Sequence, residues 1–194
     1  MKANKCVLLL AVVAGLSAGA APAVAPDVSS WHGDIDVVAV YYPHWHKYPK
    51  GTEWFGEKWD EGEWAFVRTA VPRYPGHRVP IQPLPGYLNG RDPKDVATEI
   101  ALASNAGIDV FLYDYYYYGG KVTQEEAIEQ GFLKAANRDR LKFCLMWANH
   151  DATTLWAKRL HSTLGEVKIW DGRVNREQFE TVCHRIIEKY FTQP

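Results

Sequence analysis

The 194-residue sequence has little excess charge of either sign. Lysine and arginine total 22 and aspartate and glutamate total 23, which gives a formal net charge of −1, and no block of basic residues stands out. Nucleic acids and anionic membrane surfaces are bound through concentrated positive charge. We therefore expect no nucleic-acid partner.

Cysteines are few, and metal-ligand motifs are missing. Cys144 and Cys183 lie in strand-like and helix-like patterns, where we expect both to be buried, and their spacing does not decide whether they form a disulfide. His44 and His46 would share one face of a strand, but no third ligand clusters with them. We therefore expect no metal and no cofactor.

No apolar run suited to crossing a membrane was identified: the one at residues 7–16 is too short. Two lysines precede it, and Ala18 and Ala20 follow at the spacing of an A-x-A cleavage site, so residues 1–20 are predicted to be a secretory signal peptide. A cut after Ala25 also fits the spacing but would leave Pro26 first. We expect a secreted or periplasmic protein with a polar lead-in at residues 21–36.

Aromatic residues, in contrast, are abundant, with eight tryptophans and eleven tyrosines. Tryptophan and tyrosine combine a flat apolar face with a hydrogen-bonding tip, which suits a sugar whose C–H faces stack on rings and whose hydroxyls need partners. A tryptophan-rich core is the alternative interpretation. The composition favours an oligosaccharide or polysaccharide ligand.

The most informative stretch runs from Gly107 to Gly120. An apolar run leads to Asp114, four tyrosines follow at residues 115–118, and two glycines close the stretch. Such a run is typical of a strand in a parallel sheet, buried on both faces. Because active sites of parallel barrels lie at the C-terminal ends of strands, we expect substrate near Asp114 and these tyrosines, unless the tyrosines only cap the sheet.

Strand and helix patterns alternate along the chain. Strands are predicted at residues 36–43, 107–118 and 141–151, and helices at 92–106, 123–137 and from Asn175 onward. The Pro- and Gly-rich residues 47–89 are expected to pack over the mouth of the site, with a short helix near 63–70. This order predicts an α/β fold with parallel strands, namely the first three β/α units of a (β/α)8 TIM-type barrel.

Several ordered segments resemble a known family. They are Tyr41-Tyr42-Pro43, Thr52-Glu53-Trp54, Pro72-Arg73-Tyr74-Pro75-Gly76-His77, Gly86-Tyr87, Arg91-Asp92-Pro93, Gly107 to Phe111 and Trp147-Ala148-Asn149. From about Val37 to the C-terminus they resemble the glycoside hydrolase family 99-like, or WbsX-type, domain, which makes residues 37–194 the N-terminal part of such a barrel. The resemblance implies a (β/α)8 barrel related to endo-α-mannosidases, with a branch described as glycosyltransferases.

The resemblance leaves the catalytic residues unassigned. In the hydrolases it implies catalytic carboxylates in a Glu-rich motif near the end of the barrel, beyond residue 194. Glu53 and Asp114 match positions of the substrate pocket. In the WbsX branch a glutamate follows Trp-Ala-Asn, whereas here His150 and Asp151 follow.

Candidate site residues follow from the pattern of residues at the strand ends and from the family resemblance. Glycoside hydrolysis uses two carboxyl groups roughly 5 to 10 Å apart, and Asp114, Asp151 and Glu53 are weak candidates for such a pair. Asp109, at the opposite end of its strand, is expected to be structural. The expected substrate-binding residues are Tyr41, Tyr42, His44, Asp114, Tyr115, Trp147, Asn149 and His150.

Three functions fit the sequence. The first is a glycan-processing, glycoside hydrolase-like protein of the endo-mannosidase type, truncated before its catalytic carboxylates. The second is a glycosyltransferase of polysaccharide biosynthesis, although Gly119-Gly120 lacks the Gly-x-Gly-x-x-Gly context of a phosphate-binding loop. The third, favoured by the missing motif, is a non-catalytic glycan-binding protein or an inactive fragment.

Overall fold

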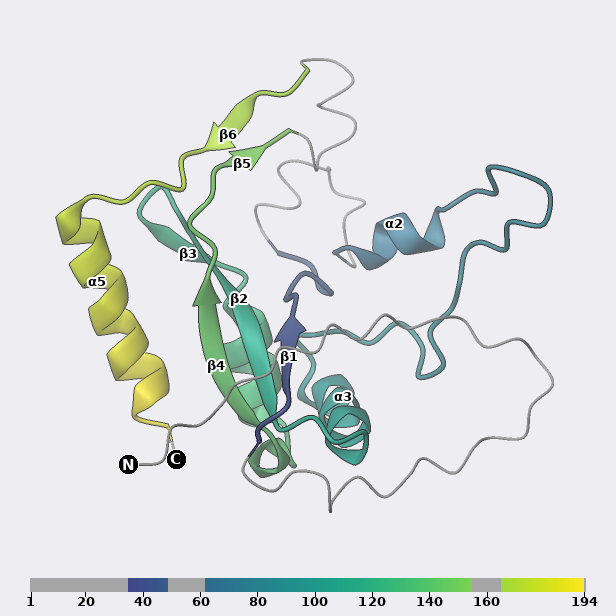
Figure 1. Ribbon diagram of the computed structural model, residues 1–194, viewed down its shortest axis with the longest axis horizontal. Coiled ribbons are helices and arrows are strands. Elements are labelled where there is room, and N and C mark those ends of the chain that lie inside the picture. Colours follow the sequence, from purple (N-terminus) through teal and green to yellow (C-terminus); the bar gives the residue numbers. More distant parts are fainter. Residues whose placement is uncertain (1–34, 49–61, 155–164, 194) are drawn as a thin grey trace.

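A parallel sheet forms the centre of the computed structural model, which describes residues 35–48, 62–154 and 165–193. Strand β2 (Val110–Tyr118) lies between β1 (Val38–Tyr41) and β4 (Lys142–Trp147), and pairs in parallel with both (Figure 1). Val110 is in register with Val38 on one side and with Lys142 on the other. The predicted parallel α/β architecture is confirmed at this level. The predicted signal peptide lies outside the described residues.

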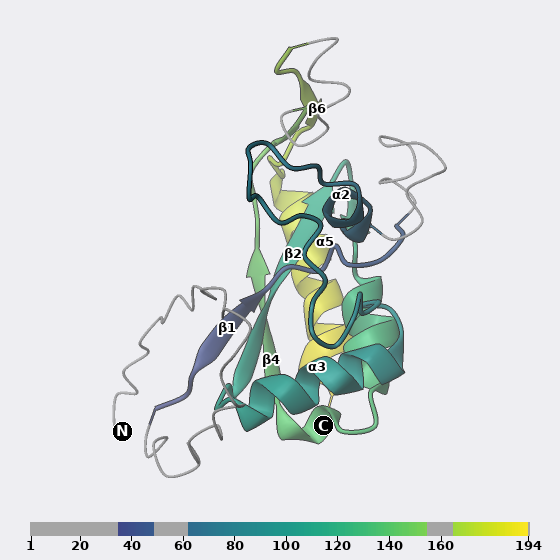
Figure 2. The same ribbon diagram turned by 90° about the vertical axis from the view of Figure 1, so that its right-hand side faces the viewer.

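The helices pack on one face of this sheet (Figure 2). They are α3 (Pro93–Asn105), the π-helical η1 (Ala127–Gly131), the 3₁₀ segments η2 (Phe132–Lys134) and η3 (Arg138–Arg140), α5 (Arg176–Ile186) and the π-helical η4 (Ile187–Phe191). Alternate strand residues meet them in the core. The fully or nearly buried core members include Val96, Ile100, Phe111, Tyr113, Tyr115, Ile128, Phe132, Val182 and Tyr190.

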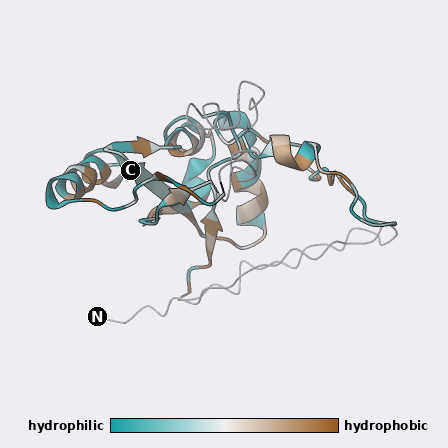
Figure 3. Cartoon of the chain, turned by 90° about the horizontal axis from the view of Figure 1, so that it is seen from above, coloured by the Kyte–Doolittle hydropathy of each residue, from teal (hydrophilic) through white to brown (hydrophobic). Residues whose placement is uncertain are grey.

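Two of the predicted helix starts are confirmed by their caps. The side chain of Asp92 accepts a hydrogen bond from the Lys94 backbone N–H at 2.9 Å. Asn175 and Gln178 form a reciprocal capping box at the start of α5. Figure 3 shows hydrophilic and hydrophobic residues together on α5, as expected for a helix with one side towards a core.

The opposite face of the sheet carries no helix among the described residues. We call it the open face; its non-tyrosine apolar members are Val38, Val40, Val110, Leu112, Cys144 and Met146. Val40 is 49% exposed and Met146 is 38% exposed. The expectation that Cys144 is buried is therefore wrong, because it belongs to the uncovered face; Cys183 on α5 is half-buried and carries a free thiol.

The predicted continuous helix at residues 123–137 is also wrong. Strand β3 (Lys121–Thr123) instead turns back and pairs with the last three tyrosines of β2. Gly119 and Gly120 have positive φ angles, which permits the tight turn. The backbone of the long tyrosine segment needs hydrogen-bond partners, and β3 provides them. The chain then continues as the short π and 3₁₀ turns η1 and η2.

The segment after the first strand follows its prediction only in part. The short helix α2 (Trp64–Arg68) is present, and Glu63 beside it reaches the sheet. Residues 71–86 are mostly exposed, with Leu84 fully so, and residues 49–61 of the same stretch lie outside the described residues. Strands β5 (Ala152–Thr153) and β6 (Lys168–Trp170) form an antiparallel pair beyond β4. No helix in the described part of the chain is long and apolar enough to span a membrane.

Candidate functional site

Polar and aromatic side chains gather where β1, β2 and β4 end. Because the three strands are parallel, their carboxyl ends share one edge of the sheet, as the arrowheads in Figure 1 show. We call this group the strand-end site. Its members are Tyr42, His44, Tyr48, Glu63, Asp114, Tyr116, Gln124 and His150.

The exit of β1 places an imidazole against a carboxylate. The rings of Tyr42 and His44 stack with centroids 4.0 Å apart, and the Tyr42 hydroxyl lies 2.9 Å from His44 Nδ1. The Glu63 Oε1 atom lies 3.4 Å from that hydroxyl and 3.5 Å from Nδ1. Gly62 makes this approach possible: its φ is 59°, and a Cβ there would lie 2.2 Å from the His44 carbonyl oxygen. Glycine therefore brings Glu63 to His44.

The end of β2 supplies the second carboxylate. Asp114 and Tyr116 are two residues apart and project from the open face, where the Tyr116 hydroxyl donates to Asp114 Oδ2 at 3.2 Å. The other oxygen, Oδ1, is buried and has no hydrogen-bond partner among the described residues. The Tyr116 ring lies edge-on to His44 at 5.4 Å and to His150 at 6.2 Å. Tyr116 thus connects the ends of all three strands.

Burial shifts the pKa values of His44 and Asp114 in the direction that favours the neutral form of each side chain. Desolvation lowers the pKa of His44, although the neighbouring Glu63 carboxylate opposes the shift. Desolvation raises the pKa of Asp114, against the hydrogen bond from Tyr116 and the nearby imidazoles. A neutral imidazole can accept a proton from a ligand, and a carboxyl group with a raised pKa is a better proton donor than an ordinary aspartate is at the same pH.

Asp151, one of the weak catalytic candidates, is engaged in structure. Its Oδ1 accepts a hydrogen bond from the Gly172 backbone N–H at 2.8 Å, and its Oδ2 lies 2.9 Å from Lys168 Nζ. The pKa of Asp151 is lowered, first by the Gly172 bond and then by Lys168. Asp151 thus joins the end of β4 to the β5–β6 pair. Glu53, another candidate, lies outside the described residues.

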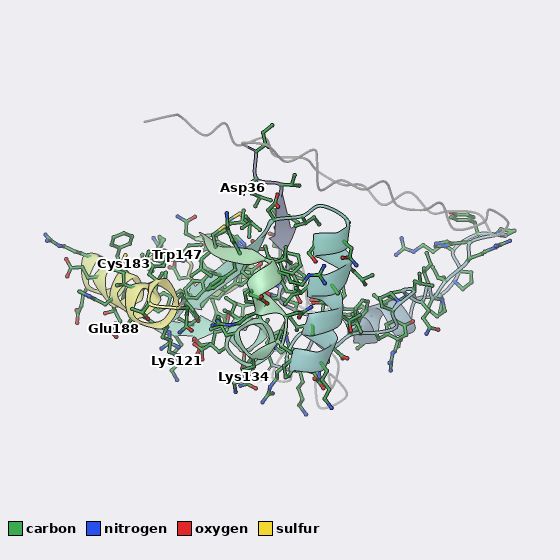
Figure 4. All side chains as sticks on the ribbon, turned by 90° about the horizontal axis from the view of Figure 1, so that it is seen from below. Asp36, Lys121, Lys134, Trp147, Cys183 and Glu188 are labelled. Carbon is green, nitrogen blue, oxygen red and sulfur yellow. The ribbon has the colours of Figure 1, made fainter. Side chains whose placement is uncertain are left out.

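Three of the expected substrate-binding residues face away from this site. The Tyr41 hydroxyl donates to Glu99 at 2.7 Å, the Tyr115 ring meets Tyr190, and the Trp147 ring stacks on Phe179 of α5 at 5.8 Å. Figure 4 shows Trp147 beside α5. These side chains lie on the helix-covered face because strand side chains alternate, so Tyr41, Tyr115 and Trp147 do not join the strand-end site. Asn149 is exposed.

The other histidine of the first strand end also lies elsewhere. His46 is 1% exposed, with Nε2 3.8 Å from Glu126 Oε2, whereas His44 contacts Glu63. Residues 44 and 46 lie beyond the end of β1, so strand alternation does not govern them, and both rings lie against Tyr48. No set of three or more potential metal ligands comes together within the described ranges.

Sequence reasoning did not identify several members of the strand-end site. Glu63, Tyr48 and Gln124 lie in segments without a clear pattern, so no local signal marks them. Tyr116 was expected near the substrate only as one of four tyrosines, although strand alternation places it on the same face as Asp114 and so distinguishes it from Tyr115. Asp109 is structural as expected, since its carboxylate accepts the Val37 backbone N–H at 2.8 Å.

Comparison with known proteins gives a family and two relatives. Residues 37–193 match the family described as "Glycosyltransferase WbsX". Two proteins named "Uncharacterized protein WxcX", from two strains of Xanthomonas campestris pv. campestris, are each 32% identical over 138 residues, which is 71% of this chain and 17% of theirs. The chain thus spans about a sixth of the length of these relatives. No solved structure matches it.

Proposed function

The chain belongs to the WbsX family of glycan-related proteins, and on that premise we propose that the strand-end site binds a sugar unit of an oligosaccharide or polysaccharide. One observation carries the proposal: beside the rings of Tyr116 and His44, Asp114 presents a carboxyl oxygen that has no hydrogen-bond partner among the described residues. Sugar hydroxyls need such acceptors, and aromatic faces suit their C–H surfaces.

Glycan hydrolysis is the reaction we propose for this site. The raised pKa of Asp114 suits a general acid, which would pass its proton to the glycosidic oxygen as the bond to the anomeric carbon breaks. A second carboxylate would then assist attack by water or form the glycosyl bond itself. Glu63 is the candidate among the described residues, because it contacts His44, which interacts electrostatically with Asp114.

Glycosyl transfer is the second candidate, and the description of the family favours it. A nucleotide-sugar donor brings a diphosphate, which proteins hold with cationic groups or clustered backbone amides. Near the described part of the site the Lys168 ammonium is already paired with Asp151. Glycan binding without catalysis remains the third function to be separated by experiment.

The binding test uses the full chain. Neutral manno-oligosaccharides and other neutral oligosaccharides are titrated into wild type, Asp114→Asn and Tyr116→Phe, with Asp139→Asn as the matched control at an exposed aspartate in η3. Asparagine places only a neutral carbonyl or an NH2 group where the carboxyl oxygen stood, so Asp114→Asn should weaken binding roughly tenfold and Asp139→Asn should not. Equal binding by wild type and Asp114→Asn would contradict the proposal.

Products then separate the three functions. Hydrolysis in ¹⁸O-labelled water places the label at a new reducing end, which mass spectrometry detects. Transfer consumes a nucleotide sugar and lengthens the acceptor glycan. Binding with neither product supports the non-catalytic function.

We also propose that the parallel sheet is part of a (β/α)8 barrel with the open face directed inward. The outer edges of β1 and β4 pair with no other described strand. A cavity of about 560 Å³ lies beside β4, lined by apolar side chains that include Leu141, Phe143, Leu145, Tyr190 and Phe191. It shares no lining residue with the strand-end site, and a further β/α unit would fill it.

We also propose that the protein is exported from the cytoplasm. A secreted or periplasmic location follows from the predicted signal peptide at residues 1–20. N-terminal sequencing of the protein recovered outside the cytoplasm should begin at Ala21. Recovery of the intact N-terminus from the cytoplasm alone would contradict export.

A further inference from the structure

Gln124 adopts an unusual backbone conformation directly after β3. Its φ angle is 65°, and within the described ranges it is the residue other than glycine with a positive φ. Glycine would adopt this conformation without the clash that a Cβ introduces. Backbone conformations of this kind persist where surrounding structure holds them, and they concentrate at functional sites.

The side chain of Gln124 is buried in the strand-end site. It is 8% exposed, and its Nε2 lies 3.4 Å from His44 Nδ1. The same amide forms a hydrogen bond to Tyr48. The two N–H groups of the Gln124 amide thus face His44 Nδ1 and the Tyr48 hydroxyl. The Gln124 Oε1 atom is buried without a partner among the described residues. The left-handed backbone and the buried amide thus occur at the same residue.

The distances around His44 favour one tautomer. The Tyr42 hydroxyl lies 2.9 Å from Nδ1 and 3.4 Å from Glu63 Oε1, and the same Oε1 lies 3.5 Å from Nδ1. The shorter contact favours donation from Tyr42 to the imidazole, whereas the carboxylate attracts a proton onto Nδ1, so a further donor at Nδ1 is needed to hold the ring proton on Nε2. The Gln124 amide approaches the same nitrogen as a second donor. A nitrogen that accepts from two donors carries no proton, which leaves the ring proton on Nε2. His44 Nε2 has no partner among the described residues.

We propose that Gln124 is a positioning residue that holds His44 in the Nε2–H tautomer and so leaves Nε2–H to donate to a ligand in the strand-end site. The inference builds on the proposed glycan site, but its first test needs no glycan. The groups that face His44 from the surrounding elements, and enter its titration, are Tyr42, His46, Tyr48, Glu63, Asp114 and Tyr116.

Nitrogen-15 NMR of the histidine rings tests the proposal on the full chain. At pH 7.5 the His44 signals, assigned by their loss in His44→Gln, should show the proton on Nε2. In Gln124→Glu a carboxylate replaces the donor at equal size, so the pKa of His44 should rise by about one unit or more and the proton should move to Nδ1. Gln124→Leu should mix the tautomers.

Gln124→Gly separates the backbone from the side chain. It relieves the left-handed backbone, so the thermal midpoint should not fall below that of Gln124→Leu, yet it should lose the single tautomer as Gln124→Leu does. A proton on Nδ1 in wild type, or a wild-type tautomer in Gln124→Leu, would overturn the proposal.

Glycan titration then tests the link to function. If the wild type binds a sugar, Gln124→Leu should weaken it about tenfold while Asp139→Asn does not. Unchanged sugar binding by Gln124→Leu would overturn the role towards a ligand. Should the wild type bind none of the tested glycans, the proposed function fails, while the tautomer result still decides whether Gln124 positions His44.

Discussion

Burial of Glu99 beside the first strand raises the pKa of its carboxyl group towards neutral pH. Glu99 on α3 is half-buried and accepts a hydrogen bond from the Tyr41 hydroxyl at 2.7 Å. Desolvation raises its pKa to about 7, and the Tyr41 bond offsets only part of that shift. The group lies on the helix side of the sheet, so it acts on stability and not on the strand-end site.

Glu99→Gln tests this effect. The folded-state pKa of Glu99 exceeds the unfolded value, so the folded chain binds more protons between about pH 4.5 and 7, and stability falls as the pH rises through that window. Glutamine keeps an acceptor for Tyr41 and cannot ionise. The variant should exceed wild type by about 1 to 3 kcal/mol in the free energy of unfolding at pH 8, and by much less at pH 5.

Urea unfolding at both pH values measures the difference. Glu188→Gln, at an exposed glutamate of η4, is the matched control and should show little difference at either pH. An equal gain from Glu99→Gln at pH 5 and pH 8 would show that ionisation of Glu99 is not its cause.

At the scale of elements, α3 is anchored by its first residues. The Asp92 carboxylate accepts the Lys94 N–H, and the Asp92 carbonyl accepts the Val96 N–H at 3.0 Å. Because α3 supplies Val96 and Ile100 to the core, its start determines how the helix lies against β1 and β2. The cap therefore acts on the whole core.

Asp92→Ala should lower the free energy of unfolding by about 1 kcal/mol, because it leaves a helix N-terminal N–H without its acceptor. Asp92→Asn retains an acceptor and should lose less than about half of that. Chemical denaturation of the three proteins side by side provides the measurement. Equal losses in both variants would assign the effect to the charge and not to the cap.

The two faces of the sheet differ at the scale of the whole molecule. One is covered by α3, η1, η2 and α5, and the other, the open face, exposes Val40 and Met146. Apolar surface and unpaired strand edges promote association between chains. The isolated chain is therefore expected to self-associate through this side.

Val40→Lys and Phe143→Ala probe the two faces. Val40→Lys should reduce self-association in analytical ultracentrifugation and change the free energy of unfolding by no more than about 0.5 kcal/mol. Phe143 packs against Phe132 and Tyr190, so Phe143→Ala should cost about 3 kcal/mol. A loss from Val40→Lys as large as that from Phe143→Ala would show that the open face is covered in solution.

The sequence by itself determined the three parallel strands and the helices α3 and α5, but not β3 or the β5–β6 pair. Apolar runs located β1, β2 and β4, and Asp92 and Asn175 marked two helix starts, because strand periodicity and capping act over a few residues. The placement of Asp114 at a strand end followed from the same local pattern. The family, too, could be identified from ordered motifs alone.

Only the tertiary structure decided which side chains meet. Glu63 lies 19 residues from His44 in the sequence, and Gln124 lies 80 residues from it. The first contact depends on the close approach of a glycine and the second on a residue with a left-handed backbone, and no local sequence pattern predicts either. The placement of the helices decided that Tyr41 and Tyr115 belong to the core. A strand residue belongs to one of two faces by alternation, but which face becomes core depends on packing between distant segments.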